Sequence, residues 1–424
     1  MMDVGEPVQS QVARHSVGLA QPAPEGAPEN ASSPLPDCGG TCFPQAAGSS
    51  ADLAASLWAK RQQQRALALT EVWAGRRSGW WGRYLEALHR LLLDMPAAVA
   101  VAAFRPAVVG LALSRQSGDS EAMTSALGLI RFLVGGPNQQ ALTLVIPAEA
   151  FGPSGRLYFP HLHAVVESRG PLAVEADASE VRFTWIDGAG ATLAAAPAYH
   201  GAGQSGQRVT LLPSVLGWRV LNGNPDLEAP IEELPVQPAP LVEPAWLDNL
   251  VNGARLLRQV WPVAALAARR YLDSVILQPL PAEGHVTSVT LGRLQGSLIA
   301  SLRDPVQVAD ALCHEGSHTR LGLFLQMDPL IEDDEAAVHP SPWRQDPRPL
   351  KGLLNGVHAF VNVCEFYRRL ALAEPTLAEP AEAVYSVQRR RVLEAWDYLE
   401  PRLRPTRLGQ TLVAELAAAV RGLR

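Results

Sequence analysis

The sequence is poor in cysteine and has no excess of basic charge. Four cysteines in 424 residues are too few for a small secreted scaffold held by disulfides. The pair in "PDCGGTCFP" lies in a Gly/Pro-rich segment with no second pair, so we interpret it as incidental, and Cys313 and Cys364 as small core residues. The formal net charge is −6 without a long basic run, which argues against nucleic acid as the main partner.

Long apolar runs are also missing. No run of about 20 apolar residues occurs, and the first residues lack the basic segment and apolar core of a secretory signal. We therefore expect a cytoplasmic protein without a membrane anchor. Hydrophobic residues nevertheless make up 47% of the chain, enough for two or three globular units with cores of their own.

The composition changes along the chain and predicts four regions. Residues 1–50 are rich in Pro, Gly, Ser and Ala and should form a disordered extension, whereas residues 51–135 have helical spacing. Residues 136–238 contain β-branched and aromatic runs between turns, such as "ALTLVIP" and "EVRFTWIDGAGATL". The Pro-rich "LPVQPAPLVEP" then leads into residues 239–424, which are mainly helical. The expected class is α+β, mainly helical, with a β-rich middle and a C-terminal helical metal-binding domain.

The metal prediction comes from an H-E-x-x-H motif in the helix-compatible run "ADALCHEGSHTRLG". Residues four apart share a helix face, so His314 and His318 can bind one ion together. Glu315 lies about 100° further around the helix, where it can act as a base or support the ligands. One such motif arises by chance in roughly one chain in a hundred of this histidine content, so its context must be considered.

Two short β-like runs, residues 286–291 and 297–302, precede the motif. Asp304 is a good N-cap and Pro305 suits a first helical turn, so a helix should run from there to about Met327. This strand-to-helix order is zincin-like. The expected helix is apolar and buried, and buried His and Glu side chains need partners, which favours a metal site over a solvated cluster. The strand "GSLIASL" could also offer an exposed edge to a peptide.

A metal site needs a third protein ligand. A second helix is expected from about Leu350, and one face of it carries mostly short polar residues: Lys351, Asn355, His358, Asn362 and Glu365. His358 is our first choice of ligand and Glu365 the alternative. His339 and the acidic residues 332–335 are less favoured because their segment reads as a solvated loop. An exposed polar face is the other interpretation of this stripe.

Two further histidines lie in the β-rich region. His161 and His163 in "HLH" would point to one face of a strand, as two ligands of a cupin-like site do. No third carboxylate follows at a fixed spacing, so we favour an ordinary half-exposed strand.

The segment "SPWRQDPRP" holds Arg344 and Arg348 close to Trp343 and Asp346. Arginine forms bidentate pairs with carboxylates, so these residues could clamp a carboxylate cosubstrate or a peptide terminus. They could equally brace the loop by pairing with Asp346. Both interpretations stay open.

Together, "LCHEGSHTRLG" and "SPWRQDPRPLKGLLNGVHAFVNVCEFYRR" resemble the H-E-x-x-H motif domain found in the maturation of bacterial ribosomally synthesised peptide natural products. The resemblance covers roughly residues 240–424. It implies an iron(II)- and 2-oxoglutarate-dependent peptide β-hydroxylase whose partner is a ribosomally synthesised precursor peptide. The roles that it implies are metal ligation by His314 and His318, the motif glutamate at Glu315, and 2-oxoglutarate binding by Arg344 or Arg348. It does not secure the third ligand.

Two rival functions stay open beside this one. The motif alone would favour a zinc metallopeptidase of gluzincin type, with Glu315 as the general base on a zinc-bound water. A non-catalytic precursor-peptide binding protein would instead hold a structural metal in a closed set of four ligands, adding His339 or Glu365. Ligand type does not decide between zinc and iron, because two histidines suit both. The oligomeric state is not predicted.

Overall fold

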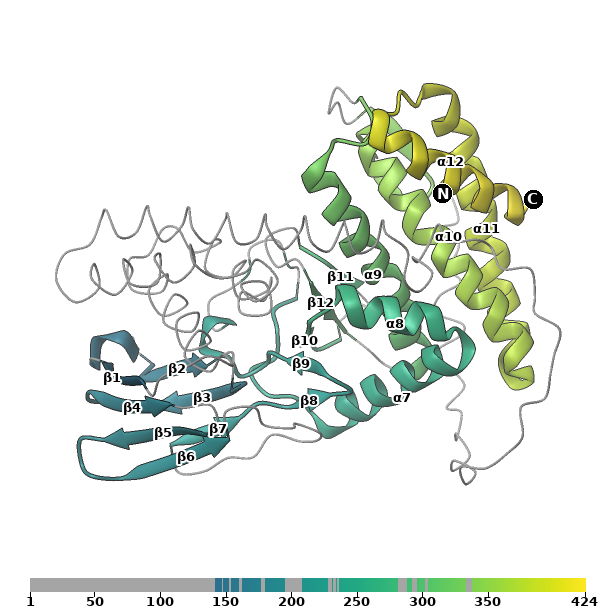
Figure 1. Ribbon diagram of the computed structural model, residues 1–424. Helices are drawn as coiled ribbons and strands as arrows, with labels where there is room; N and C mark the ends of the chain where they lie inside the picture. The colour runs from purple at the N-terminus through teal and green to yellow at the C-terminus, as the bar shows by residue number, and fades with distance from the viewer. Residues whose placement is uncertain are drawn as a thin grey trace, which may run out of the picture. The chain divides into compact units, whose positions relative to one another are not determined.

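The computed structural model describes residues 142–424 (Figure 1), apart from residues 147, 152–153, 160–161, 177–179, 195–207, 228–230, 232–233, 235, 281–287, 292–295, 302–303 and 333–337. The extension expected at residues 1–50 and the helices expected at residues 51–135 lie outside the described residues. Strands dominate as far as Val220, and helices dominate from Pro244 onward. A mixed α and β class with a helical C-terminal region is therefore confirmed.

The described chain forms two compact units. One contains Asn252–Ala268 and Arg303–Arg424, and we call it the helical unit. The other contains the described residues up to Val251 together with Arg269–Leu302, and we call it the β-rich unit.

Two antiparallel sheets of the β-rich unit enclose one apolar core. One sheet has the order β1-β4-β5-β6 and the other the order β2-β3-β7. Their strands are β1 (Leu142–Ile146), β2 (Arg156–Phe159), β3 (Ala164–Glu167), β4 (Leu172–Ala176), β5 (Glu180–Trp185), β6 (Gly190–Ala194) and β7 (Val209–Leu211). Along β5 buried and more exposed residues alternate, so Val181, Phe183 and Trp185 face this core, as the period of a half-buried strand requires.

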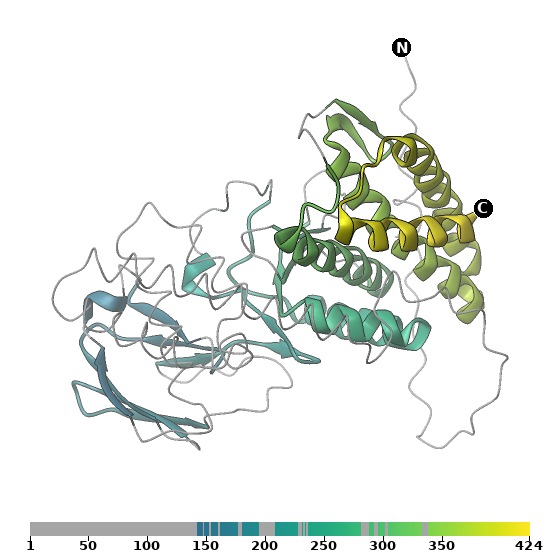
Figure 2. The ribbon, with the colours of Figure 1, turned by 45° about the horizontal axis from the view of Figure 1, so that its top comes forward.

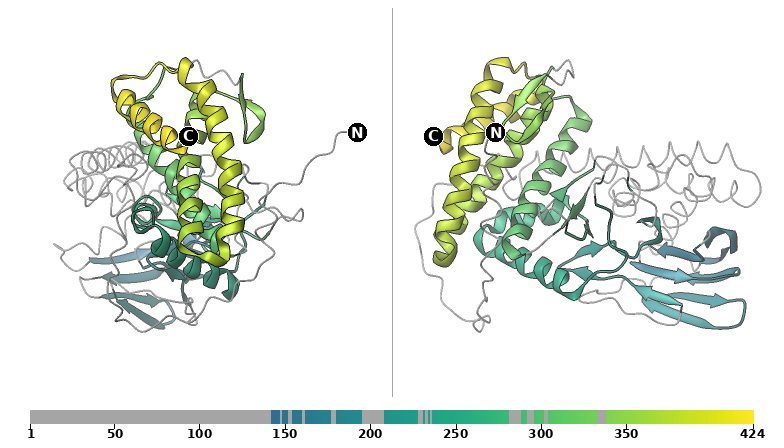
Figure 3. Two further views of the ribbon diagram at one scale, coloured as in Figure 1. Left: turned by 90° about the vertical axis from the view of Figure 1, so that its right-hand side faces the viewer. Right: turned by 180° about the vertical axis from the view of Figure 1, so that it is seen from behind.

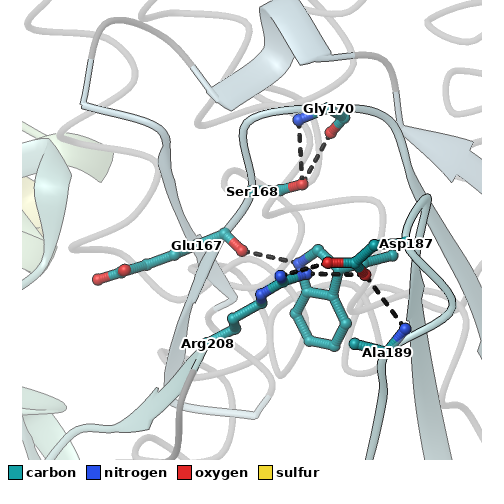
Figure 4. A network of polar contacts seen from close by, with 7 residues as sticks. Glu167, Ser168, Gly170, Asp187, Ala189 and Arg208 are labelled. Carbon is teal, nitrogen blue, oxygen red and sulfur yellow. Dashed lines mark hydrogen bonds and ion pairs between the residues drawn. The ribbon is translucent and has the colours of Figure 1, made fainter.

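A polar clasp fixes the turn between β5 and β6 (Figure 4). The guanidinium of Arg208 pairs with the carboxylate of Asp187 and lies over the Trp185 ring, 5.4 Å from its centroid. The Trp185 indole N–H donates to the Glu167 carbonyl at 2.8 Å, and the Asp187 carboxylate accepts the Ala189 N–H at 3.1 Å. The hydrogen bond that Asp187 accepts from Arg208 lowers the pKa of the Asp187 carboxyl. The clasp therefore links β3, the turn after β5 and the start of β7.

His163 does not lie on a strand, so the half-exposed strand position expected for it is wrong. It occupies the turn between β2 and β3 with a positive φ of 48° and is 1% exposed. Its Nδ1 lies 2.8 Å from the Tyr158 hydroxyl and its Nε2 lies 2.8 Å from the Pro213 carbonyl. Both ring nitrogens are used in structural hydrogen bonds. His161 lies outside the described residues.

A five-stranded mixed sheet, in the order β11-β12-β10-β9-β8, brings together strands from both sides of the boundary expected at residue 238. Its strands are β8 (Ser214–Val215), β9 (Trp218–Val220), β10 (Ser274–Leu277), β11 (Ser288–Val289) and β12 (Ser297–Ala300). β10 runs parallel to both β9 and β12. The prediction of an open edge along "GSLIASL" is wrong at Ile299 and Ala300, because β11 pairs with these two residues.

The C-terminal region is built from helices. They are α7 (Pro244–Val260), α8 (Pro262–Tyr271), α9 (Pro305–Met327), α10 (Leu350–Ala373), α11 (Ala378–Leu399) and α12 (Arg407–Leu423). Short 3₁₀ helices span Ala148–Phe151, Pro225–Leu227, Pro375–Leu377 and Glu400–Arg402. None of the helices in the described part of the chain is long and apolar enough to cross a membrane.

The long helices α10 and α11 run side by side in opposite directions, since only a short 3₁₀ turn joins them (Figure 3). α12 packs with both of them (Figure 2), and buried apolar residues such as Val361, Trp396 and Val420 form their common core. The hairpin of β13 (His339–Ser341) and β14 (Arg344–Arg348) contacts α10. α10 thus contacts α9, the hairpin and α11.

Candidate metal centre

The H-E-x-x-H motif lies in the middle of α9, as the sequence predicts. Asp304 caps this helix, because its Oδ1 accepts the N–H groups of Val306 and Gln307 at 2.9 and 3.0 Å. Pro305 occupies the first turn and the helix ends at Met327, so the predicted bounds are confirmed.

The imidazoles of His314 and His318 converge. Their Nε2 atoms lie 3.0 Å apart, and the ring centroids are 4.5 Å apart with nearly perpendicular planes. Two nitrogens that each bind one ion at about 2.1 Å are separated by roughly 3.0 to 3.4 Å. The observed 3.0 Å separation is compatible with two Nε2 ligands of one metal ion.

Asn355 on α10 orients His318. Its Oδ1 lies 2.9 Å from Nδ1 of His318 and accepts the hydrogen of that nitrogen. Nε2 of His318 then carries the lone pair that a metal ligand needs. A ligand histidine in a metalloprotein commonly donates its other N–H to an oxygen in this way.

Burial keeps His314 and His358 neutral. Burial and the neighbouring His318 lower the pKa of His314 to about 4. Burial, helped by the charge of Arg320 and by His318, lowers the pKa of His358 well below its usual value. Near neutral pH both imidazoles are uncharged, which metal ligation requires.

His358 lies one helical turn beyond Asn355 and is 2% exposed. Its Nδ1 is buried and has no hydrogen-bond partner among the described residues. A buried polar atom without a partner costs about 1 to 3 kcal/mol, so a ligand or water at this position would be stabilising. Among the described residues, however, no three His, Cys, Asp or Glu side chains are already grouped to hold a metal. His358 as the third ligand therefore stays a prediction.

The other sequence candidates have partners of their own. The Glu365 carboxylate accepts hydrogen bonds from Arg368 and Arg369, at 2.6 to 2.8 Å. Nδ1 of His339 lies 3.1 Å from the Tyr398 hydroxyl. Glu315 is 1% exposed, and its charge acts on both His314 and Asp310.

Both arginines of the "WRQDPR" segment lie on β14 and pair with Asp346. Arg344 Nε is 3.1 Å from Oδ1, and an Arg348 terminal nitrogen is 3.3 Å from Oδ2. These pairs lower the pKa of Asp346. The bracing that the sequence allowed is thus present, while the exposed Arg344 and half-exposed Arg348 remain accessible to an anion.

Sequence analysis missed Asp310, which lies one turn before His314. Its carboxylate accepts a hydrogen bond from the Tyr367 hydroxyl of α10 at 3.0 Å. Burial raises the pKa of Asp310 to about 7, and nearby Glu315 adds to the rise. A lone carboxylate in the apolar run "VADALC" was the available signal.

Comparison with known proteins adds no family assignment. The chain matches none of the protein-family models, and none of the curated proteins matches its sequence.

The donor set fits a divalent ion of the zinc or iron type. Two converging imidazoles, one of them oriented by an amide oxygen, and a third buried imidazole with an unpartnered nitrogen provide nitrogen donors suited to such ions. His314, His318 and His358 are the residues that would hold it.

Proposed function

We propose that the protein is a metal-dependent peptide-modifying enzyme that hydroxylates the β-carbon of a side chain in a ribosomally synthesised precursor peptide, with iron(II) and 2-oxoglutarate as cofactors. The observation that carries this proposal is the 3.0 Å approach of the His314 and His318 Nε2 atoms. The resemblance of "LCHEGSHTRLG" and "SPWRQDPRP" to the peptide-maturation domain supplies the reaction class. Synthesis of such a peptide on ribosomes agrees with a cytoplasmic enzyme.

The burial of Glu315 favours the hydroxylase over the zinc peptidase. A peptidase of this type needs the motif glutamate to take a proton from a water at the metal. Here Glu315 is 1% exposed, whereas His314 and His318 are only half-buried. The Glu315 carboxylate is therefore less accessible to solvent water than the two histidines are. β12 nevertheless directly precedes α9 in the chain, an order that a zincin-type peptidase would also have, so the peptidase remains the rival.

Each residue of the site then has a defined task. His314 and His318 bind the ion through Nε2, and Asn355 holds the hydrogen of His318 on Nδ1. Arg344 and Arg348 would bind the distal carboxylate of 2-oxoglutarate in place of Asp346, because a guanidinium pairs with either carboxylate. When bound, iron(II) would activate dioxygen, which is the oxidant: one of its oxygen atoms would go to the peptide and the other to 2-oxoglutarate, which would be oxidised to succinate and carbon dioxide.

The decisive experiment combines metal analysis with a peptide assay. The full chain is purified without added zinc, its metal content is measured, and it is incubated with iron(II), ascorbate, 2-oxoglutarate and the precursor peptide encoded beside its gene. A hydroxylase makes a product heavier by one oxygen atom, about 16 Da, and only when 2-oxoglutarate is present. The His314→Ala variant should make none, and Gln345→Ala, which alters an exposed residue of β14, should keep full activity.

The other results point to the rivals. Shortened peptides that form without 2-oxoglutarate would favour the peptidase. Retained metal with an unchanged peptide would favour the binding protein with a structural ion. Replacing both arginines, Arg344→Gln with Arg348→Gln, should raise the KM for 2-oxoglutarate while leaving metal content intact.

A further inference from the structure

Three stacked or edge-on rings lead from the hairpin to the metal centre. The Trp343 ring stacks on Phe360, with centroids 4.7 Å apart and planes inclined by only 3°. Phe360 stands edge-on to His314, with centroids 4.8 Å apart and planes inclined by 70°. We call Trp343, Phe360 and His314 the aromatic column. It joins the hairpin to α10 and α10 to α9.

Trp343 is fixed at the outer end of this column by two contacts. Its indole N–H donates to Oε1 of Gln388 on α11 at 3.2 Å, and Gln388 is buried at 3% exposure. Gly356 provides the second contact, because a β-carbon there would lie 3.0 and 3.2 Å from two atoms of the Trp343 ring. A β-carbon at this position would force the indole to move away from α10 by a few tenths of an ångström.

Phe360 contacts both Trp343 and His314 and so connects the two rings. Phe360 and His314 are both half-buried: Phe360 packs against the core of α10, α11 and α12, and His314 also contacts His318. Densely packed rings resist rotation, since movement of one requires displacement of the next. The His314 imidazole is therefore held from Phe360 at the angle from which its Nε2 meets that of His318.

We propose that Trp343 is a positioning residue of the metal centre, which holds the His314 imidazole in its ligating orientation through Phe360. The inference rests on the proposed metal site. Its physical basis is preorganisation: a ligand that is oriented before the ion arrives loses less conformational freedom on binding. Because Trp343 directly precedes Arg344, the same stack also fixes the start of the strand that carries both arginines.

The first test measures zinc binding by the metal-free full chain in competition with a chromophoric chelator. Trp343→Ala should raise the Kd for zinc about tenfold or more, the range seen when groups that orient a ligand are lost. Trp343→Phe keeps a ring that can stack and should restore most of the affinity. Cobalt(II) in place of zinc should show a changed visible spectrum in Trp343→Ala, because the arrangement of its ligands changes. Circular dichroism of each metal-free variant checks that it folds.

A pair of glycine variants supplies the matched control, since removal of a tryptophan can loosen the fold. Gly352 and Gly356 lie one turn apart on α10, and alanine is the better helix former at either by about 1 kcal/mol. At Gly356 the added carbon meets the Trp343 ring, whereas at Gly352 nothing lies closer than 3.4 Å. Gly356→Ala should therefore weaken zinc binding, and Gly352→Ala should leave it unchanged.

The outcomes separate this inference from the proposed function. If the natural protein and His314→Ala bind zinc equally, the metal site is wrong and the positioning role falls with it. If the natural protein binds zinc through His314, but Trp343→Ala and Gly356→Ala bind it as tightly, only the positioning role is overturned. If Trp343→Ala unfolds, the comparison of Gly356→Ala with Gly352→Ala decides.

Discussion

His318 can ligate a metal through Nε2 only while its hydrogen sits on Nδ1, and Asn355 is the residue that keeps it there. The two side chains lie 37 positions apart in the chain, and their atoms lie 2.9 Å apart. The amide oxygen can only accept, so the imidazole nitrogen must donate. Asn355 thus selects the tautomer in which His318 is a ligand.

Removal of this acceptor should weaken metal binding without unfolding the protein. Asn355→Leu has a similar size but cannot accept the His318 N–H, so we expect the Kd for zinc to rise about 10- to 100-fold. Asn355→Asp retains an acceptor oxygen and should bind at least as tightly as the natural protein. Competition with a chelator measures both. Equal affinity of the leucine variant and the natural protein would show that the amide does not orient the ligand.

At single residues, the sequence predicts contacts that follow from helix geometry and misses those made by packing. His314 and His318 meet because residues four apart share a helix face. Nothing local couples Trp343 to Phe360, or Asp310 to Tyr367, since each contact depends on how α10 packs. The turn at His163 had a signal that was overlooked: Pro160 in "FPHLHA" disfavours a continuous strand.

At the scale of elements, α9 and α10 are joined by a polar contact within an apolar interface. The Tyr367 hydroxyl donates to Asp310, a carboxylate whose pKa burial raises from 3.8 to about 7. In the unfolded chain the same carboxyl ionises near its ordinary pKa. The unfolded state therefore binds fewer protons between about pH 4 and 7, so the free energy of unfolding falls as the pH rises through this window.

Asp310→Asn should abolish this part of the pH dependence, because an amide does not ionise and still offers Tyr367 an acceptor. Relative to the natural protein, the metal-free variant should gain stability at pH 8 but not at pH 4. Denaturant titrations at both pH values measure the difference. Tyr367→Phe is the companion variant: its lost hydrogen bond lowers the pKa of Asp310 in the natural protein, so this variant should show a larger total loss of stability that extends to higher pH. This account would be contradicted if the free energies of unfolding of Asp310→Asn and the natural protein differed by the same amount at both pH values.

Elements with strong local signals could be predicted, whereas their pairing could not. The Asp304–Pro305 start predicted α9, and apolar spacing predicted α10 from Leu350. The parallel pairing of β10 with β9 was not foreseen, because it joins residues more than 50 positions apart across the Pro-rich segment. Parallel partners require a crossover connection of about a dozen residues or more, and no turn residue marks their pairing.

At the scale of the whole molecule, the site residues all belong to one compact unit. His314, His318, His358 and the arginine-bearing hairpin lie within Arg303–Arg424, and the seven strands around the first β core lie in the other unit. A metal ion that binds only the folded helical unit should stabilise that unit by mass action. The β-rich unit contributes none of the proposed ligands.

Amide hydrogen exchange of the full chain, with and without zinc, should therefore respond in one unit only. At a zinc concentration of 100 times the Kd the stabilisation is about 2.7 kcal/mol, so amides that exchange through opening of the site should slow by roughly a hundredfold. We expect this gain in α9 and α10, because α9 supplies two ligands and α10 supplies Asn355 and His358. Strands β1 to β6 should exchange at an unchanged rate, and His314→Ala should lose the effect throughout. A zinc ion bound by α9 and α10 must slow amide exchange in these helices if it slows exchange anywhere. Slower exchange in strands β1 to β6 without slower exchange in α10 would therefore show that zinc binds elsewhere.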